Sequence, residues 1–148
     1  MEQTVENMDT KDLFQEVYTQ FKMHFYQAIF KNFESREATL TTVETFCMEV
    51  ICALGRPTVK EFADFLGMSS PNAAYKVNNL VKKGYLRKVN SEVDRREYYL
   101  EVTEKYMNYY NVSTSYVDEV MDRVEKRMSV QEWANFKHTL EVILKELV

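Results

Sequence analysis

The distribution of glycine and proline is the feature that most constrains how this chain can fold. Its 148 residues include only three glycines and two prolines, and all five lie between residues 55 and 84. Because these residues interrupt helices and supply turns, the 54 residues before this window and the 64 after it can form long unbroken helices. Their scarcity argues against an all-β sandwich and against a glycine-rich phosphate loop. The sequence therefore predicts a mainly α-helical protein with one finely divided module.

Apolar residues at spacings of three and four predict long helices on both sides of that module. One extends from about Thr10 to Phe33, another begins near Thr103, and the last begins near Ser129, where Glu132 completes a capping-box pattern. The apolar face of the first helix would be roughly 34 Å long at 1.5 Å per residue. A small helical module does not cover that length, so we expect part of the face to contact another subunit. Packing within the same chain is the alternative.

The module itself shows the pattern of a winged helix-turn-helix. Three helices are predicted, from Thr41 or Thr42 to Leu54, over 59–66, and over 71–83, with Ser70 as the cap of the last one and Pro71 as its first helical residue. The hydrophobic period then changes from 3.6 to 2, which predicts two short strands over 85–89 and 98–102 joined by a polar loop. Two helices with a short turn, followed by a hairpin, are typical of DNA-binding winged helices.

The charge distribution bears on whether this module meets nucleic acid. The formal net charge is −4, from 19 basic and 23 acidic residues, which by itself disfavours a nucleic-acid partner. Residues 71–96, however, contain seven basic and two acidic residues, so this window carries +5 and the rest of the chain −9. The sequence therefore predicts one basic surface on an otherwise acidic protein.

The helix over 71–83 is expected to read base edges in a major groove. Its outward face offers amide, phenol and ammonium groups and no carboxylate, while Arg95 and Arg96 at the hairpin tip are suited to the minor groove, with Asp94 orienting an arginine. A solvated polar face is the simpler alternative, and a winged-helix module that binds protein is the rival function. The residues expected to contact DNA are Ser69, Ser70, Asn72, Tyr75, Lys76, Asn78, Asn79, Lys82, Lys88, Arg95 and Arg96.

The stretch from Phe62 to Thr103, FADFLGMSSPNAAYKVNNLVKKGYLRKVNSEVDRREYYLEVT, resembles the DNA-binding domain of the MarR (multiple antibiotic resistance regulator) family. The shared marks are LGMS before the recognition helix, NLVKKGYL across its end, and DRR nine residues before Thr103. The Asp-x-Arg wing motif of that family falls on Asp94 and Arg96. Two positions depart from its pattern: Tyr106 replaces the glycine of Thr-x-x-Gly, and Pro71-Asn72 stands where Ser/Thr pairs are common.

The resemblance implies a homodimeric transcriptional repressor that binds a pseudo-palindromic operator of double-stranded DNA. It divides the chain into an N-terminal dimerisation helix (1–38), a winged helix-turn-helix domain (39–103) and C-terminal dimerisation helices (104–148). Members of the family respond to phenolic ligands, oxidants or metals, so an unknown small-molecule effector is also a candidate partner. The residues expected in the dimer interface are Phe14, Val17, Phe21, Trp133, Phe136, Leu140 and Leu144.

Other candidate sites are weak. Cys47 and Cys52 are five residues apart on one apolar helix, a poor geometry for a disulfide, and burial there would make the thiols inert, so an oxidant sensor is the lesser hypothesis. His24 and His138 lack the companions of a zinc site. An effector pocket lined by Phe21, Phe25, Phe46, Met48 and Tyr106 is a further hypothesis.

No catalytic motif, membrane-spanning run or signal peptide is recognised in the sequence. We therefore expect a cytoplasmic protein that is not an enzyme and that uses no cofactor or metal.

Overall fold

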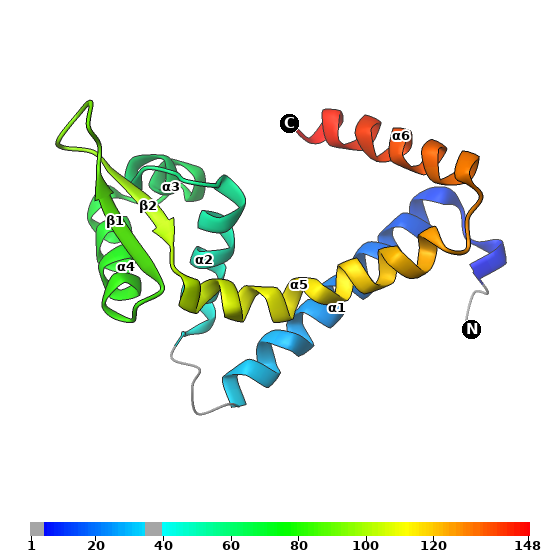
Figure 1. The fold of residues 1–148 in the computed structure, drawn as a ribbon, viewed down its shortest axis with the longest axis horizontal. Helices are drawn as coiled ribbons and strands as arrows, with labels where there is room; N and C mark the ends of the chain where they lie inside the picture. Colours follow the sequence, from blue (N-terminus) through cyan, green and yellow to red (C-terminus); the bar gives the residue numbers. More distant parts are fainter. Residues whose placement is uncertain (1–4, 35–39) are drawn as a thin grey trace. The chain divides into compact units, whose positions relative to one another are not determined.

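The structure is a computed structural model that describes residues 5–34 and 40–148, except for the side chains of 32–34, 109 and 111–114. The fold is mainly α with a two-stranded β wing, as the sequence predicts. Figure 1 shows the elements, which are a short 3-10 turn (Val5–Asn7), α1 (Thr10–Glu34), α2 (Thr42–Leu54), α3 (Val59–Leu66), α4 (Ser70–Lys82), β1 (Leu86–Asn90), β2 (Tyr98–Val102), α5 (Glu104–Glu125) and α6 (Val130–Leu147).

The chain divides into two compact units. One contains the described residues up to His24 together with Thr114–Val148, and the other is Phe25–Ser113. Both α1 and α5 therefore continue from one unit into the other. The boundary that the sequence suggests between residues 38 and 39 lies outside the described residues.

Polar caps fix where three of the helices begin. In each capping box the hydroxyl of the cap accepts a hydrogen bond from a backbone N–H three residues later, and the glutamate at that position accepts one from the backbone of the cap. The pairs are Thr41 with Glu44 for α2, Thr58 with Glu61 for α3, and Ser129 with Glu132 for α6. These caps confirm the starts predicted near Thr41 and Ser129.

The start of α4 corrects the sequence prediction by one residue. The cap is Ser69, whose backbone is extended (φ −66°, ψ 151°) and whose Oγ accepts a hydrogen bond from the N–H of Asn72 at 3.4 Å. Ser70, predicted as the cap, is instead the first helical residue, and it is exposed. Pro71 at the second position costs no hydrogen bond, because the first N–H groups of a helix have no intrahelical partner.

The two strands form an antiparallel hairpin with Leu86 opposite Val102 and Asn90 opposite Tyr98. The segment before α3 attaches to the outer edge of β2, since Thr58 forms a bridge with Tyr99 and the N–H of Leu100 donates to the carbonyl of Pro57 at 2.8 Å. The hairpin is thereby tied to the helical part of the unit. Gly84, with φ of 83°, makes the turn from α4 into the first strand.

The core of the winged unit collects side chains from α2, α3, α4, both strands and α5. Three residues of α4 are fully buried, which fixes its apolar stripe inward and leaves its polar residues outward. Tyr106 of α5 is buried, and its hydroxyl donates a hydrogen bond to Oε1 of Glu49 at 2.6 Å. Burial raises the pKa of Glu49, although this hydrogen bond opposes the shift. The fully buried side chains include Met48, Ile51, Phe62, Ala73, Val77, Leu80, Leu100 and Tyr106.

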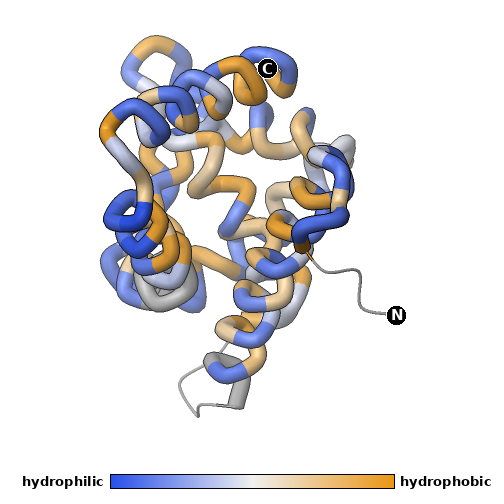
Figure 2. The backbone as a smooth tube through the Cα atoms, turned by 90° about the vertical axis from the view of Figure 1, so that its right-hand side faces the viewer, coloured by the Kyte–Doolittle hydropathy of each residue, from blue (hydrophilic) through white to orange (hydrophobic). Residues whose placement is uncertain are grey.

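The helices of the other unit are amphipathic but leave large apolar side chains exposed. Hydrophobic and hydrophilic positions alternate along the tube in Figure 2. No residue of α6, all of which is described, is buried, and its Leu144 and Leu147 are 61% and 78% exposed. Among the described helices, none is long and apolar enough to cross a membrane.

Candidate nucleic-acid interface

The exposed face of α4 consists of polar and basic side chains. Asn72, Tyr75, Asn78 and Lys82 are exposed, and Tyr75 is 67% exposed in spite of its large ring. Residues 73, 77 and 80 are fully buried on the opposite side. The outward face carries hydrogen-bond donors and acceptors at helical spacing and contains no acidic residue.

Two of the expected contact residues on α4 are only partly exposed. Lys76 and Asn79 are half-buried. Asn78 is exposed, and its Oδ1 accepts a hydrogen bond from Nζ of Lys88 on β1 at 3.4 Å. The same ammonium lies 4.7 Å from the ring centroid of Tyr98. The hairpin and α4 thus present one shared polar surface.

The tip of the wing is a structured turn built by two side chains. Ser91 is buried, and its Oγ accepts hydrogen bonds from the N–H groups of Val93 and Asp94 at 3.2 and 3.3 Å. Asn90 adds a bond from its amide to the carbonyl of Arg95 at 3.1 Å. Neither Ser91 nor Asn90 is among the residues predicted from the sequence, although Ser and Asn directly after a predicted strand are common residues for such turns.

The arginine pair of the wing is exposed and one of the two is oriented locally. Oδ1 of Asp94 accepts from both the backbone N–H of Arg96 at 2.9 Å and its Nε at 3.3 Å. The side chain of Arg96 remains 92% exposed in this ion pair. The remaining N–H groups of the guanidinium can therefore be offered to a ligand while the Asp94 contact limits the rotamers of the side chain.

A hollow of about 410 Å³ lies between α3, the start of α4 and the wing. Its lining includes Ser70, Lys88 and Arg96, which were expected at the interface, and Lys60, which was not. Lys60 lies on the exposed side of α3 and donates to Asp64 at 2.6 Å, a bond that raises its pKa. A basic residue in the first turn of the preceding helix was the signal that could have indicated it.

Some basic residues of the window 71–96, which carries a net charge of +5, form ion pairs within the winged unit. Arg87 lies 3.5 Å from a carboxylate oxygen of Glu101, which also pairs with Arg56 at 2.9 Å. Lys83 pairs with Glu44 of α2 at 2.6 Å. The side chain of Lys83 is 30% exposed and that of Arg87 is 68% exposed. Lys83 therefore belongs to the internal organisation of the winged unit, and the charge available to a ligand is smaller than the count in the sequence suggests.

The thiols and histidines show no assembled site among the described residues. Cys47 is buried, Cys52 is half-buried, and both are free. Burial raises the pKa of each thiol, and the nearby Glu49 adds to the upward shift at Cys52.

The ring of His24 stacks on that of Tyr116, with 3.9 Å between the ring centroids. No cluster of three metal-binding side chains occurs among residues 5–34 and 40–148 as far as their side chains are described. Of the residues suggested for an effector pocket, Met48 and Tyr106 are core residues with no exposed surface.

Comparison with solved structures identifies the fold. A MepR variant from a multidrug-resistant S. aureus isolate is 18% identical and aligns over 96% of this chain and 99% of its own, with a TM-score of 0.67. A MarR family protein from Bacillus stearothermophilus is 14% identical, with coverage of 93% and 91% and a TM-score of 0.65. FabT from Streptococcus pneumoniae, solved in complex with DNA, is 22% identical, with coverage of 94% and 97% and a TM-score of 0.63. A search of curated protein sequences finds no match.

Comparison with protein-family models gives a match over part of the chain. The model of the MarR family matches residues 39–97, which contain α2, α3, α4, β1 and the wing up to the start of β2. The alignments with the MepR variant and with FabT cover 96% and 94% of this chain, so they also include the long helices on both sides of this region. Over residues 39–97 this chain is therefore similar to the MarR family, and the solved structures show the same fold.

Proposed function

We propose that the chain is a transcriptional regulator that binds a pseudo-palindromic DNA operator as a homodimer and acts as a repressor. In this proposal α4 enters the major groove and the wing arginines enter the adjacent minor groove. The observation that carries it is the outward face of α4, where exposed amide, phenol and ammonium groups occur without a carboxylate, beside an exposed arginine pair.

The chemistry of α4 suits base readout. Asn72 and Asn78 can each donate and accept in a two-pronged pair with an adenine edge, and Tyr75 can donate to a phosphate or contact a thymine methyl. Lys82 at the end of the helix supplies positive charge for the backbone. A major groove about 12 Å wide accepts one α-helix. The polar side chains of α4 can reach the bases only if they face outward, which requires the apolar stripe of α4 to face the protein core. The full burial of that stripe, residues 73, 77 and 80, supports this orientation.

The wing complements the helix. Narrow A·T-rich minor grooves have a strong negative potential that attracts guanidinium groups. Arg95 is exposed, and Arg96 is exposed while held by Asp94. We therefore assign minor-groove binding to the two arginines and an orienting role to Asp94.

The homodimer is supported by apolar side chains that the chain leaves exposed. On α1, Phe14 and Val17 are 50% and 45% exposed, and on α6 the exposed apolar residues include Leu140 and Leu144. Exposed apolar surface of this extent typically marks an interface. FabT and a MepR variant, which share this fold, were solved with DNA and with an oligodeoxyribonucleotide. Two copies would place two α4 helices on half-sites about one helical turn apart.

The rival function is a protein-interaction module that keeps the fold without binding DNA. It requires an apolar or acidic outward face on α4. That face is instead polar and basic, so the rival has less support. We assign no catalytic residue, cofactor or metal.

Salt dependence of duplex binding tests this proposal. Phosphate contacts release counterions, so the affinity should fall linearly with salt on a logarithmic scale, by roughly 10³ to 10⁵ between about 50 and about 200 mM salt if about six to ten phosphates are contacted. Fluorescence anisotropy with a labelled duplex measures this slope. Lys82→Gln should reduce the slope by about one per contact, whereas Lys137→Gln on α6 should leave it unchanged. Absence of duplex binding at low salt would contradict the proposal.

A further inference from the structure

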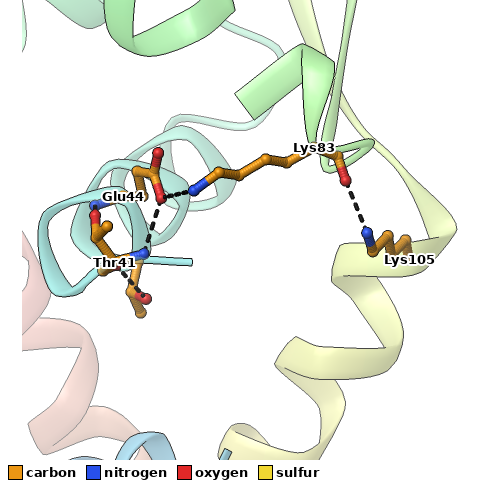
Figure 3. Close-up of polar contacts among 5 residues, drawn as sticks. Thr41, Glu44, Lys83 and Lys105 are labelled. Atoms are coloured by element: carbon orange, nitrogen blue, oxygen red, sulfur yellow. Dashed lines mark hydrogen bonds and ion pairs between the residues drawn. The ribbon is translucent and has the colours of Figure 1, made fainter. Parts of the chain in front are cut away.

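A long-range ion pair ties the end of α4 to the first turn of α2 (Figure 3). Nζ of Lys83, the residue that directly follows α4, donates to Oε2 of Glu44 at 2.6 Å, across 39 residues of sequence. The same oxygen accepts the backbone N–H of Thr41 at 2.8 Å, and Oγ1 of Thr41 accepts the N–H of Glu44 at 3.2 Å. One carboxylate thus serves both the cap of α2 and the end of α4.

This pair is shielded from solvent more than the exposed ion pair of α3. The side chains of Glu44 and Lys83 are 12% and 30% exposed, compared with 65% and 74% for Asp64 and Lys60. Burial raises the pKa of Glu44, but the hydrogen bonds from Lys83 and Thr41 outweigh it, so the net shift is downward and the carboxylate stays ionised. A shielded, charge-assisted contact is directional and keeps its geometry better than an exposed pair does.

The start of α5 holds the same turn from a second side. Nζ of Lys105 donates to the carbonyl of Lys83 at 2.7 Å, and Oγ1 of Thr103 donates to the carbonyl of Gly84 at 2.6 Å. Figure 3 shows the two lysines meeting at the end of α4, where Lys83 takes part through its carbonyl and Lys105 through its side chain. The C-terminal end of α4 is therefore anchored by polar contacts from α2 and from α5.

We propose that Glu44 and Lys83 are positioning residues for DNA recognition, because their ion pair sets the orientation of α4 without touching DNA. The inference rests on the proposed function, that α4 reads a major groove. The fully buried apolar contacts of α4 come from one stripe, Ala73, Val77 and Leu80, and such contacts are non-directional. These apolar contacts fix which face of α4 is buried, but they only weakly resist rotation of the helix about its axis or a change in its tilt. The ion pair opposes both movements.

A competing explanation is that Lys83 is one more phosphate contact. The two explanations differ in what they predict for Glu44. If Lys83 contacts phosphate, Glu44→Gln removes a negative charge near the DNA and should leave binding unchanged or strengthen it. If the pair positions α4, Glu44→Gln should weaken binding although the protein becomes more positive. Glutamine also occurs in capping boxes, so the cap of α2 is retained.

The experiment measures the affinity of four variants and two control variants for the duplex that the parent selects from a random pool. The slope of affinity against salt and the unfolding midpoint of each variant are measured as well. Glu44→Gln and Lys83→Met are each expected to weaken binding about tenfold, with the slope of affinity against salt unchanged. The double variant should bind at least as tightly as the single variant with the lower affinity, because both substitutions remove the same ion pair. Lys83→Arg, which can still donate to Glu44, should bind within about twofold of the parent. Glu141→Gln and Lys137→Met, made in the exposed pair of α6, are the matched charge controls.

The outcomes separate the two levels of the proposal. If the parent binds but both single variants bind as tightly as it does, or lose only thermal stability, the positioning role is overturned. If Lys83→Met weakens binding and lowers the slope by about one while Glu44→Gln does not weaken it, Lys83 is a phosphate contact and the inference is also overturned. If the parent selects no duplex, the proposed function fails, and the inference fails with it.

Discussion

Replacing Arg96 with alanine is expected to weaken duplex binding by about 1 to 3 kcal/mol per half-site, and twice that for a homodimer that uses both wings. The side chain of Arg96 is 92% exposed, and its Nε donates to Asp94. Because this contact already limits the rotamers of Arg96, its side chain loses little conformational entropy when the guanidinium enters a minor groove. Alanine removes both the charge and the donor fork. Titration of parent and variant against the same duplex at one salt concentration measures the difference.

Two further variants make this result specific to the wing. Arg123→Ala removes the same side chain from an exposed position on α5 and should bind as the parent does. Asp94→Ala leaves Arg96 in place without its partner and should lose only part of the affinity. Binding by Arg96→Ala that equals the parent would remove the wing from the mechanism.

Replacing Phe62 with alanine is expected to lower the free energy of unfolding by about 3 to 5 kcal/mol. Phe62 has no exposed surface and is one of the largest side chains in the core of the winged unit, so alanine leaves a cavity between α3 and its neighbours. Because a folded domain is stable by only about 5 to 15 kcal/mol, this is a large fraction of the total. Urea unfolding at one fixed protein concentration measures the change, since the stability of the proposed homodimer would depend on concentration.

Phe65 provides the matched control for this substitution. It lies on the same helix three residues later but is 63% exposed. Phe65→Ala should change the free energy of unfolding by no more than about 0.5 kcal/mol. Equal destabilisation by both variants would contradict the assignment of Phe62 to the core.

Local patterns in the sequence were sufficient to predict most of the architecture. The cluster of glycine and proline located the winged module, and the change of hydrophobic period located the hairpin. Cap residues near Thr41 and at Ser129 located two helix starts. Each signal depends on residues within a few positions of one another, which is why a single sequence contains it. The one-residue error at α4 arose because Ser69 and Ser70 are both suitable caps, and only the extended backbone of Ser69 decides between them.

Contacts between distant residues could not be predicted in the same way. Glu44 and Lys83 are 39 residues apart, and nothing in the local pattern distinguishes Lys83 from Lys82, although the first is paired within the fold and the second is exposed. Arg87 also pairs with a distant residue, Glu101, although its side chain remains 68% exposed. Charge counting identified a basic region but could not divide it into cations that hold the fold together and cations that can meet a ligand, because that division depends on tertiary packing.

The most direct test of sequence-specific DNA recognition is selection of bound duplexes from a random pool by the purified protein. We predict enrichment of a pseudo-palindrome with half-sites about one helical turn apart, since two copies of α4 in a homodimer would read them. An A·T-rich segment beside each half-site would agree with minor-groove binding by Arg95 and Arg96. A pool that shows no enriched sequence after repeated rounds would contradict sequence-specific DNA recognition and favour a protein-interaction module.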